Sequence, residues 1–179
     1  MLEQFKGKLI ISCQALPDEP LHSSFIMGRM ALAAKQAGAV GIRAQSTGDI
    51  REIKTVTGLP VIGLIKRNFD DSEIYITPTH QEIAELLDTT CEIIALDATL
   101  RKRPGDEKLA DLVNQIHAGG RLALADISSD AEGLNAEKIG FDCVSTTMSG
   151  YTPYTPSFEG PDYGLVARMA GQLSIPVFA

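Results

Sequence analysis

The sequence is poor in basic residues relative to acidic ones. Its 179 residues include 16 Lys and Arg against 23 Asp and Glu, which gives a formal net charge of −7 at pH 7. Proteins that bind nucleic acid or anionic membranes usually present a basic patch. We therefore expect neither nucleic acid nor a membrane surface among the partners of this chain.

Long apolar runs and metal-ligand spacings are also missing. No apolar run approaches the roughly 18 residues of a membrane-spanning helix, and the first residues do not resemble a signal peptide. The cysteines, Cys13, Cys91 and Cys143, are widely spaced within apolar runs, so we expect reduced, buried thiols in a cytoplasmic protein. The three histidines share no ligand spacing with them, and a bound metal is not expected.

Short apolar runs rich in β-branched residues recur seven times along the chain. Each of the first six precedes a segment with helical periodicity, and the runs start about 20 to 35 residues apart, which is the length of a βα unit. Apolar residues at consecutive positions are typical of parallel strands buried on both faces. The expected strands cover residues 8–14, 39–43, 61–66, 92–97, 121–126, 142–146 and 175–179.

This alternation predicts the α/β class and allows two architectures, a doubly wound sheet or a (β/α)8 TIM barrel. No turn carries a GxGxxG motif or a P-loop, which removes the main support for a nucleotide-binding sheet, and the near-equal spacing favours the barrel. A closed barrel usually needs about 250 residues. We therefore expect a single (β/α) barrel domain over residues 1–179, with seven strands present and the C-terminal part missing from the chain.

The helix expected over residues 23–37 carries an apolar stripe at helical spacing. We expect the stripe to face the core rather than a cofactor. Its members are Ile26, Met30, Ala33 and Ala34.

Polar side chains that could bind a substrate or move protons end six of the expected strands. All strands of a parallel barrel point the same way, so these side chains should meet at the carboxyl-terminal mouth, where barrel active sites lie. The alternative, that strands simply end where polarity begins, predicts Gly, Asn and Ser more than Arg, Lys and two Asp. The six ends are Gln14, Arg43, Lys66, Asp97, Asp126 and the pair Thr146 and Thr147.

Lys66 is the candidate for a catalytic group. A lysine at a desolvated strand end beside Arg43 has its ammonium form disfavoured, which suits a general base working near neutral pH. Arg43 suits an anionic or carbonyl-rich substrate through its forked donors. Asp97 and Asp126 could orient Lys66, bind sugar hydroxyls or close salt bridges. Lys66 could alternatively form a solvated basic pair with Arg67.

Two proline-containing loops follow expected strands, at residues 146–156 and 16–21. The first is rich in hydroxyl groups and suits a sugar, although a rigid structural cover explains it equally well. The basic cluster at residues 101–104 is expected to be solvated, without a direct role.

Several motifs together resemble those of the N-acetylmannosamine-6-phosphate 2-epimerase family, whose members are also called N-acylglucosamine-6-phosphate 2-epimerases. The likeness runs from about residue 8 to residue 179 and rests on multi-residue motifs in the right order. They are SCQALP (12–17), GLIKR (63–67), ALDAT (95–99), RKRP (101–104), ADIS (125–128) and STTMSGYT (145–152).

The resemblance implies an isomerase that interconverts N-acetylmannosamine 6-phosphate and N-acetylglucosamine 6-phosphate by inversion at C2, in sialic-acid catabolism. It implies no metal and no organic cofactor, a phosphorylated N-acyl amino sugar as the bound partner, and a homodimer for the full-length protein. By motif position, Lys66 is expected to transfer the proton, with Asp126 as an orienting catalytic group. The expected substrate-binding residues are Gln14, Arg43, Thr147, Ser149 and Tyr151.

Inversion at C2 also requires a second acid, which in the family is a Glu directly after the strand-seven motif; here the motif at residues 175–179 is the last segment. The family's glycine-rich phosphate loops are likewise expected beyond residue 179. Two alternatives therefore stay open. One is a Schiff-base sugar-phosphate aldolase that uses Lys66, and the other is a non-catalytic sugar-phosphate-binding fragment.

Overall fold

The computed structural model describes residues 1–157 and 159–179 and contains a sheet of seven parallel strands, paired in chain order. All seven expected strands are confirmed, but the second runs two residues beyond Arg43. The strands are β1 (Ile10–Cys13), β2 (Gly41–Gln45), β3 (Val61–Leu64), β4 (Ile93–Asp97), β5 (Leu122–Asp126), β6 (Cys143–Ser145) and β7 (Val177–Phe178).

Each crossover between consecutive strands contains one α-helix. The α-helices are α1 (Ser24–Gln36), α2 (Thr47–Thr57), α3 (His80–Leu87), α4 (Leu109–Ala118), α5 (Asp130–Ile139) and α6 (Tyr163–Gln172). Short 3-10 helices add η1 (Leu2–Phe5), η2 (Pro104–Asp106) and η3 (Thr146–Met148). None of the helices described is long and apolar enough to cross a membrane.

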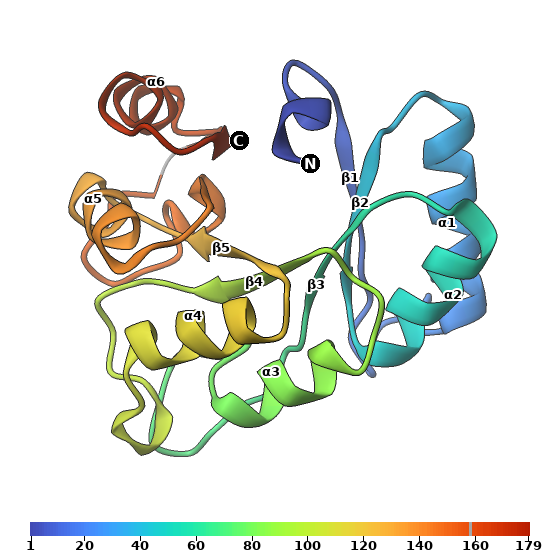
Figure 1. Cartoon of the computed structure of the whole chain (residues 1–179), viewed down its shortest axis with the longest axis horizontal. Helices are drawn as coiled ribbons and strands as arrows, with labels where there is room; N and C mark the ends of the chain where they lie inside the picture. The colour runs from blue at the N-terminus through green and yellow to red at the C-terminus, as the bar shows by residue number, and fades with distance from the viewer. Residues whose placement is uncertain (158) are drawn as a thin grey trace.

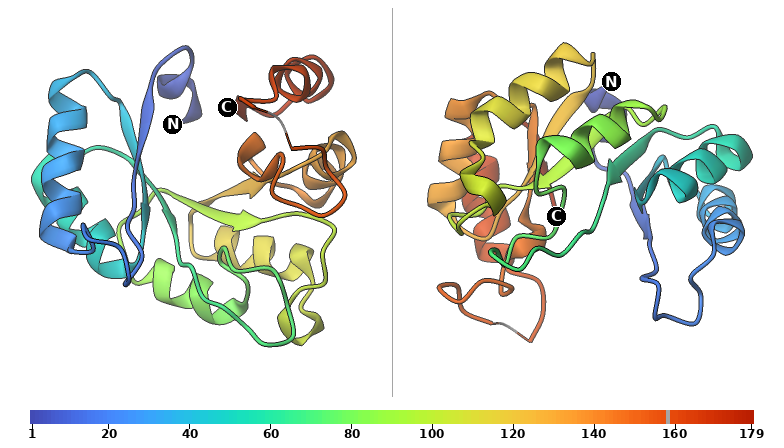
Figure 2. Two further views of the ribbon diagram at one scale, coloured as in Figure 1. Left: turned by 180° about the vertical axis from the view of Figure 1, so that it is seen from behind. Right: turned by 90° about the horizontal axis from the view of Figure 1, so that it is seen from below.

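The sheet curls into part of a (β/α) barrel with its helices on the outer side (Figures 1 and 2). β1 and β7 are its edges, and the two chain termini lie on the open side between them (Figure 1). The α/β barrel class is therefore confirmed, with the strand order of a barrel rather than that of a doubly wound sheet, in which the order reverses at a switch point.

Both faces of the sheet are apolar, which explains the consecutive apolar positions in the strands. Inward-facing residues such as Leu64, Ala95 and Leu124 form one buried cluster, while residues of opposite parity such as Leu96 and Val144 pack under the helices. The three cysteines are free and buried, as expected. The same alternation continues to the strand ends and decides which polar side chains enter the mouth.

The expected core stripe of α1 is wrong in part. Met30 is 39% exposed and Ala33 is also exposed, whereas the buried face consists of Met27, Gly28 and Ala31. The physical reason is a close approach of α2, because a Cβ atom added to Gly28 would lie 2.6 Å from Cγ of Glu52. An apolar pattern gives no weight to a glycine, so it could not predict that the face of α1 around Gly28 is the buried one.

The interior is closed at the amino-terminal end of the strands by η1. Phe5 is 4% exposed, and its ring meets that of Phe178 edge-on with centroids 5.9 Å apart. This contact links η1 to β7 across the open side of the barrel.

Candidate active site

The central feature of the mouth is an ion pair between β2 and β5. Arg43 donates from Nη1 to Oδ1 of Asp126 at 2.9 Å and from Nη2 to Oδ2 at 2.6 Å. Asp126 is fully buried; burial raises the pKa of its carboxyl, while Arg43 and the Thr147 hydroxyl lower it. Because both of its oxygens accept N–H groups from a guanidinium, we assign Asp126 the ionised form.

Lys66 lies two residues beyond β3, with the inward parity of Leu64. The pKa of its amine is lowered, first by burial and then by the positive charge of Arg43, while Glu19 and Asp126 act in the opposite direction. Within the described residues its Nζ makes no hydrogen bond and no ion pair. The group is therefore a partly buried amine with a weakened affinity for its proton and a free lone pair when neutral.

Gln14 follows β1 at the same mouth. Its Nε2 donates to the hydroxyl of Ser12 at 2.8 Å, and its buried Oε1 has no hydrogen-bond partner among the described residues. A buried acceptor without a donor is costly in a folded protein, so an N–H or O–H of a bound molecule would stabilise it.

Asp97 is not available to Lys66. Its carboxylate accepts from Thr99 and from Nη2 of Arg101 at 2.5 Å, and its backbone carbonyl accepts from Arg103. The expectation of a solvated basic cluster is therefore wrong for two of its members. Arg103 is 6% exposed and Arg101 is also largely covered, whereas Lys102 is exposed. These arginines stabilise the loop after β4.

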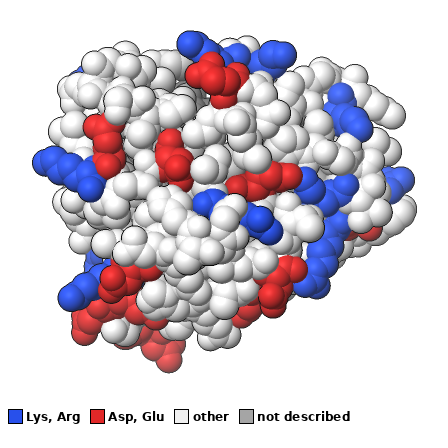
Figure 3. Space-filling model, in the orientation of Figure 1, with Lys and Arg blue, Asp and Glu red and all other residues white. Residues whose placement is uncertain are grey.

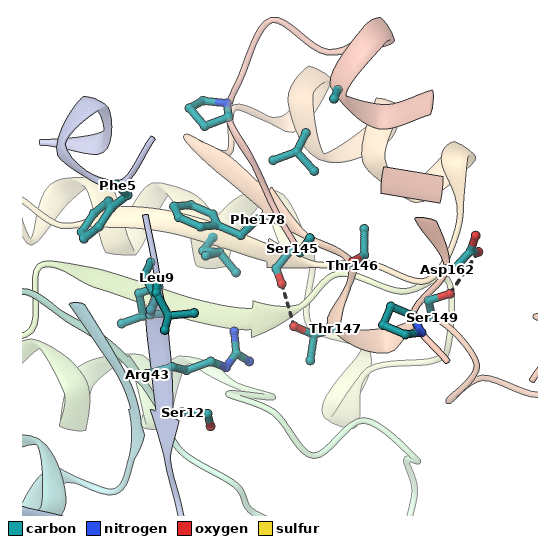
Figure 4. Close-up of a pocket in the computed structure, with 18 of the residues that line it drawn as sticks. Phe5, Leu9, Ser12, Arg43, Ser145, Thr146, Thr147, Ser149, Asp162 and Phe178 are labelled. Atoms are coloured by element: carbon teal, nitrogen blue, oxygen red, sulfur yellow. Dashed lines mark hydrogen bonds between the residues drawn. The ribbon is translucent and has the colours of Figure 1, made fainter. Parts of the chain in front are cut away.

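A cavity of about 1120 Å³ adjoins this ion pair and lies between β1 and β7. Its polar end contains Arg43, Thr147, Ser149 and Tyr151, four of the five expected substrate-binding residues. Figure 4 shows Arg43 extending toward the loop after β6, where Thr147 bonds Ser145 at 2.7 Å. Lys66, Asp126 and Gln14 do not line this cavity. The cavity therefore adjoins the ion pair but does not contain all of the predicted site residues.

The hydroxyl-rich loop after β6 is divided between two roles. Thr147 and Ser149 face the cavity, and Ser149 donates to Asp162 at 3.3 Å. Farther along, Tyr154 donates its hydroxyl proton to the buried carboxylate of Glu132 at 2.6 Å, and Thr152 is buried. The second half of the loop is thus a rigid structural cover, which was the alternative to a sugar-binding role in the sequence analysis.

Sequence reasoning missed three residues of the mouth. Glu19, in the loop after β1, faces Lys66 closely enough to oppose the lowering of its pKa. Tyr75 is partly buried near Asp97 and Asp126, and burial raises its pKa. Thr77 is fully buried beside the end of β3. The length of chain between β3 and α3 was the available signal, because long βα loops of barrels carry functional groups.

Charge and ligand chemistry point to no second candidate centre within the part of the chain that the structure describes. In residues 1–157 and 159–179, no three His, Cys, Asp or Glu side chains group in a way that could hold a metal ion. On the face in Figure 3, basic and acidic side chains are interspersed.

Comparison with known proteins identifies relatives over nearly the whole chain. Residues 27–179 match the family described as "Putative N-acetylmannosamine-6-phosphate epimerase". A Clostridium perfringens protein of the same description, a 2-epimerase, is 66% identical over 177 residues, which cover 99% of this chain and 80% of that protein. Its Clostridioides difficile counterpart is 62% identical over 179 residues, covering 100% and 80%.

A solved structure gives the same result. It belongs to the N-acetylmannosamine-6-phosphate 2-epimerase from Clostridium perfringens, is 65% identical and superposes with a TM-score of 0.97, covering 98% of this chain and 77% of that one. The fold and the family matches thus define a TIM-barrel enzyme. The chain belongs to the N-acetylmannosamine-6-phosphate 2-epimerase family.

Proposed function

We propose that the protein is an isomerase that interconverts N-acetylmannosamine 6-phosphate and N-acetylglucosamine 6-phosphate in amino-sugar catabolism. The observation that carries the proposal is the partly buried amine of Lys66 beside the Arg43–Asp126 ion pair, in a chain of this family. Epimerisation at C2 requires a base and a positive charge nearby. Lys66, whose pKa is lowered by burial and by Arg43, suits the first role, and Arg43 suits the second.

The proposed step at Lys66 breaks the C2–H bond. The proton moves to Nζ, and the electron pair remains on the sugar as enolate-like charge on the atoms next to C2. A placed base of this kind supplies about 10²- to 10⁴-fold in rate. A second acid on the opposite face returns a proton to C2, which gives the other epimer, and Nζ then releases its proton to the solvent.

Arg43 is proposed to stabilise the charge that develops next to C2. Its guanidinium is held by Asp126 in a fixed orientation, so little reorganisation is needed when the charge forms. Asp126 acts through Arg43 and leaves Lys66 without a tight ion pair. Gln14, with its unpaired acceptor, is proposed to bind a donor of the substrate.

The hydroxyl groups of Thr147, Ser149 and Tyr151 are proposed to contact the sugar phosphate from the cavity side. They lie on one loop, and the Thr147 hydroxyl lies near enough to Asp126 to lower the pKa of its carboxyl. The loop therefore couples substrate contact to the ion pair.

Product analysis tests the reaction and separates it from the aldolase alternative. The protein is incubated with N-acetylmannosamine 6-phosphate, and the sugars are followed by proton NMR, with and without borohydride. We expect N-acetylglucosamine 6-phosphate and no reduced adduct. A stable adduct at Lys66 would identify Schiff-base chemistry, and an unchanged substrate would contradict the proposal.

We further propose a cytoplasmic homodimer that needs no metal or organic cofactor. The support is the family resemblance and the absence of a candidate metal cluster among the described residues. Light scattering after gel filtration tests the oligomeric state. Activity that survives dialysis against EDTA would support the cofactor proposal, and activity restored only by an added metal would contradict it.

A further inference from the structure

The ladder between β3 and β4 ends before the mouth because another segment is inserted there. β3 pairs with β4 only at Ile62–Ile93 and Gly63–Ile94, although β4 continues to pair with β5 as far as Asp97. The inserted segment consists of residues 75–77, which return antiparallel from the long loop after β3.

The inserted segment bonds to both strands. On the β3 side, Arg67 donates its backbone N–H to the carbonyl of Tyr75 at 2.9 Å, and Lys66 forms an antiparallel bridge with Ile76. On the β4 side, the backbone N–H of Asp97 donates to the carbonyl of Ile76 at 3.1 Å. The two strands are therefore held apart by ordinary sheet hydrogen bonds.

Thr77 stands where the two strands separate. Its N–H donates to the carbonyl of Ile65 at 2.7 Å, its Oγ1 accepts the N–H of Ile65 at 3.3 Å, and its hydroxyl donates to the carbonyl of Ala95 at 2.7 Å. The residue is fully buried and has a φ of 44°. Left-handed backbone is strained for a β-branched residue and persists only where its surroundings impose it.

The separation decides which charges meet Lys66. If the register of Gly63–Ile94 continued, Lys66 would lie beside Asp97, whose carboxylate would hold the ammonium form. In the structure Asp97 is bound by Arg101 instead, and the charged groups that act on Lys66 are Arg43, Glu19 and Asp126.

We propose that Thr77 is a positioning residue that fixes the end of β3, so that Lys66 stays beside Arg43 and apart from Asp97. The proposal rests on the proposed role of Lys66 as the proton-transfer group. Because Thr77 is fully buried and bonds the backbone of Ile65, its effect passes through the placement of the next residue.

Two measurements on the Thr77 variants test the proposal. The first is the pH dependence of acetylation at Lys66, followed by mass spectrometry, which gives the pKa of the amine without requiring activity. The second is kcat and KM for epimerisation. Thr77→Val removes the hydroxyl, Thr77→Gly also relieves the positive φ, and Thr77→Ser keeps the hydroxyl.

We expect Thr77→Val and Thr77→Gly to raise the pKa of Lys66 and to lower kcat by about tenfold or more, with less change in KM, because misplacement of a reacting group costs rate. Thr77→Ser should restore both quantities to within about twofold of the wild type. The matched control is Thr89→Val, which removes another buried hydroxyl that bonds the backbone, in the turn between α3 and β4 at the amino-terminal end of the strand.

An unchanged Lys66 titration and kcat in folded Thr77→Gly would overturn the proposal, as would equal effects of Thr89→Val. If the wild type does not epimerise but the titration shifts as expected, the proposed function fails while the placement of Lys66 by Thr77 is supported. The two failures are therefore distinguishable.

Discussion

At the scale of single residues, the Arg43–Asp126 pair combines a fully buried carboxylate with a guanidinium that is 13% exposed. Taking both charges out of water is costly, and the two parallel hydrogen bonds offset that cost only while both partners are present. The pair thus holds the positive charge of Arg43 near Lys66. Burial of Lys66 and the charge of Arg43 both disfavour the ammonium form of the lysine, and the nearby charge of Asp126 opposes them only in part.

This balance predicts strongly non-additive stabilities. Arg43→Met and Asp126→Leu should each lower the free energy of unfolding by about 3 to 5 kcal/mol, because each leaves one buried charge unpaired, and the double variant should lose less than the sum. Urea unfolding measures these values. Arg29→Met, at an exposed pair with Glu52, should cost about 1 kcal/mol or less, and additive losses at the buried pair would contradict the account.

The same pair predicts the sign of a pH effect. The positive charge of Arg43 lowers the pKa of Lys66, and Glu19 and Asp126 raise it. In Arg43→Met the pKa of Lys66 should therefore rise, and the acidic limb of the pH profile of kcat/KM should move to higher pH. Arg29→Met serves again as the control. An acidic limb that stays in place or moves to lower pH would show that another group titrates.

At the scale of elements, β3 is placed by the lack of a side chain at Gly63. A Cβ atom there would lie 2.8 Å from Cδ1 of Ile50 and 3.0 Å from Sγ of Cys91, both in the buried layer under the helices. The strand that leads to Lys66 can therefore approach α2 closely only with glycine at this position.

Gly63→Ala should lower the free energy of unfolding by about 1 to 3 kcal/mol, because the core around it must shift. Thermal or urea unfolding checks this value. The matched control is Gly171→Ala in α6, where an added Cβ atom would meet no neighbouring group within 4 Å. Alanine there should be neutral or stabilising by up to about 1 kcal/mol. Equal effects of both substitutions would contradict the packing argument.

The sequence predicted those elements whose signal is local. Apolar runs marked every strand, and the common direction of parallel strands was enough to predict that Arg43, Lys66 and Asp126 lie at one mouth. It could not predict the inserted segment at residues 75–77, because that pairing is non-local and depends on a left-handed Thr77. Nor could it predict the burial of Arg103, which backbone carbonyls of Pro78 and Asp97 satisfy.

At the scale of the whole molecule, η1 covers the amino-terminal end of the interior and meets β7 at its edge. Phe5 is buried there and packs on Phe178, so its removal leaves a cavity in the buried cluster inside the sheet. Phe5→Ala should lower the free energy of unfolding by about 3 to 5 kcal/mol. Phe25→Ala, at a ring that is 63% exposed, is the control, and similar losses for both would show that Phe5 does not close the interior.

The central claim is that the amine of Lys66 removes the proton from C2. Exchange of solvent deuterium into C2 of N-acetylmannosamine 6-phosphate, followed by proton NMR in D2O, measures this step most directly. We expect exchange with the wild type and with Lys102→Ala, an exposed lysine, and a loss of about 10²-fold or more with Lys66→Ala in a protein whose circular dichroism is unchanged. Exchange that persists at the wild-type rate in Lys66→Ala would contradict the account.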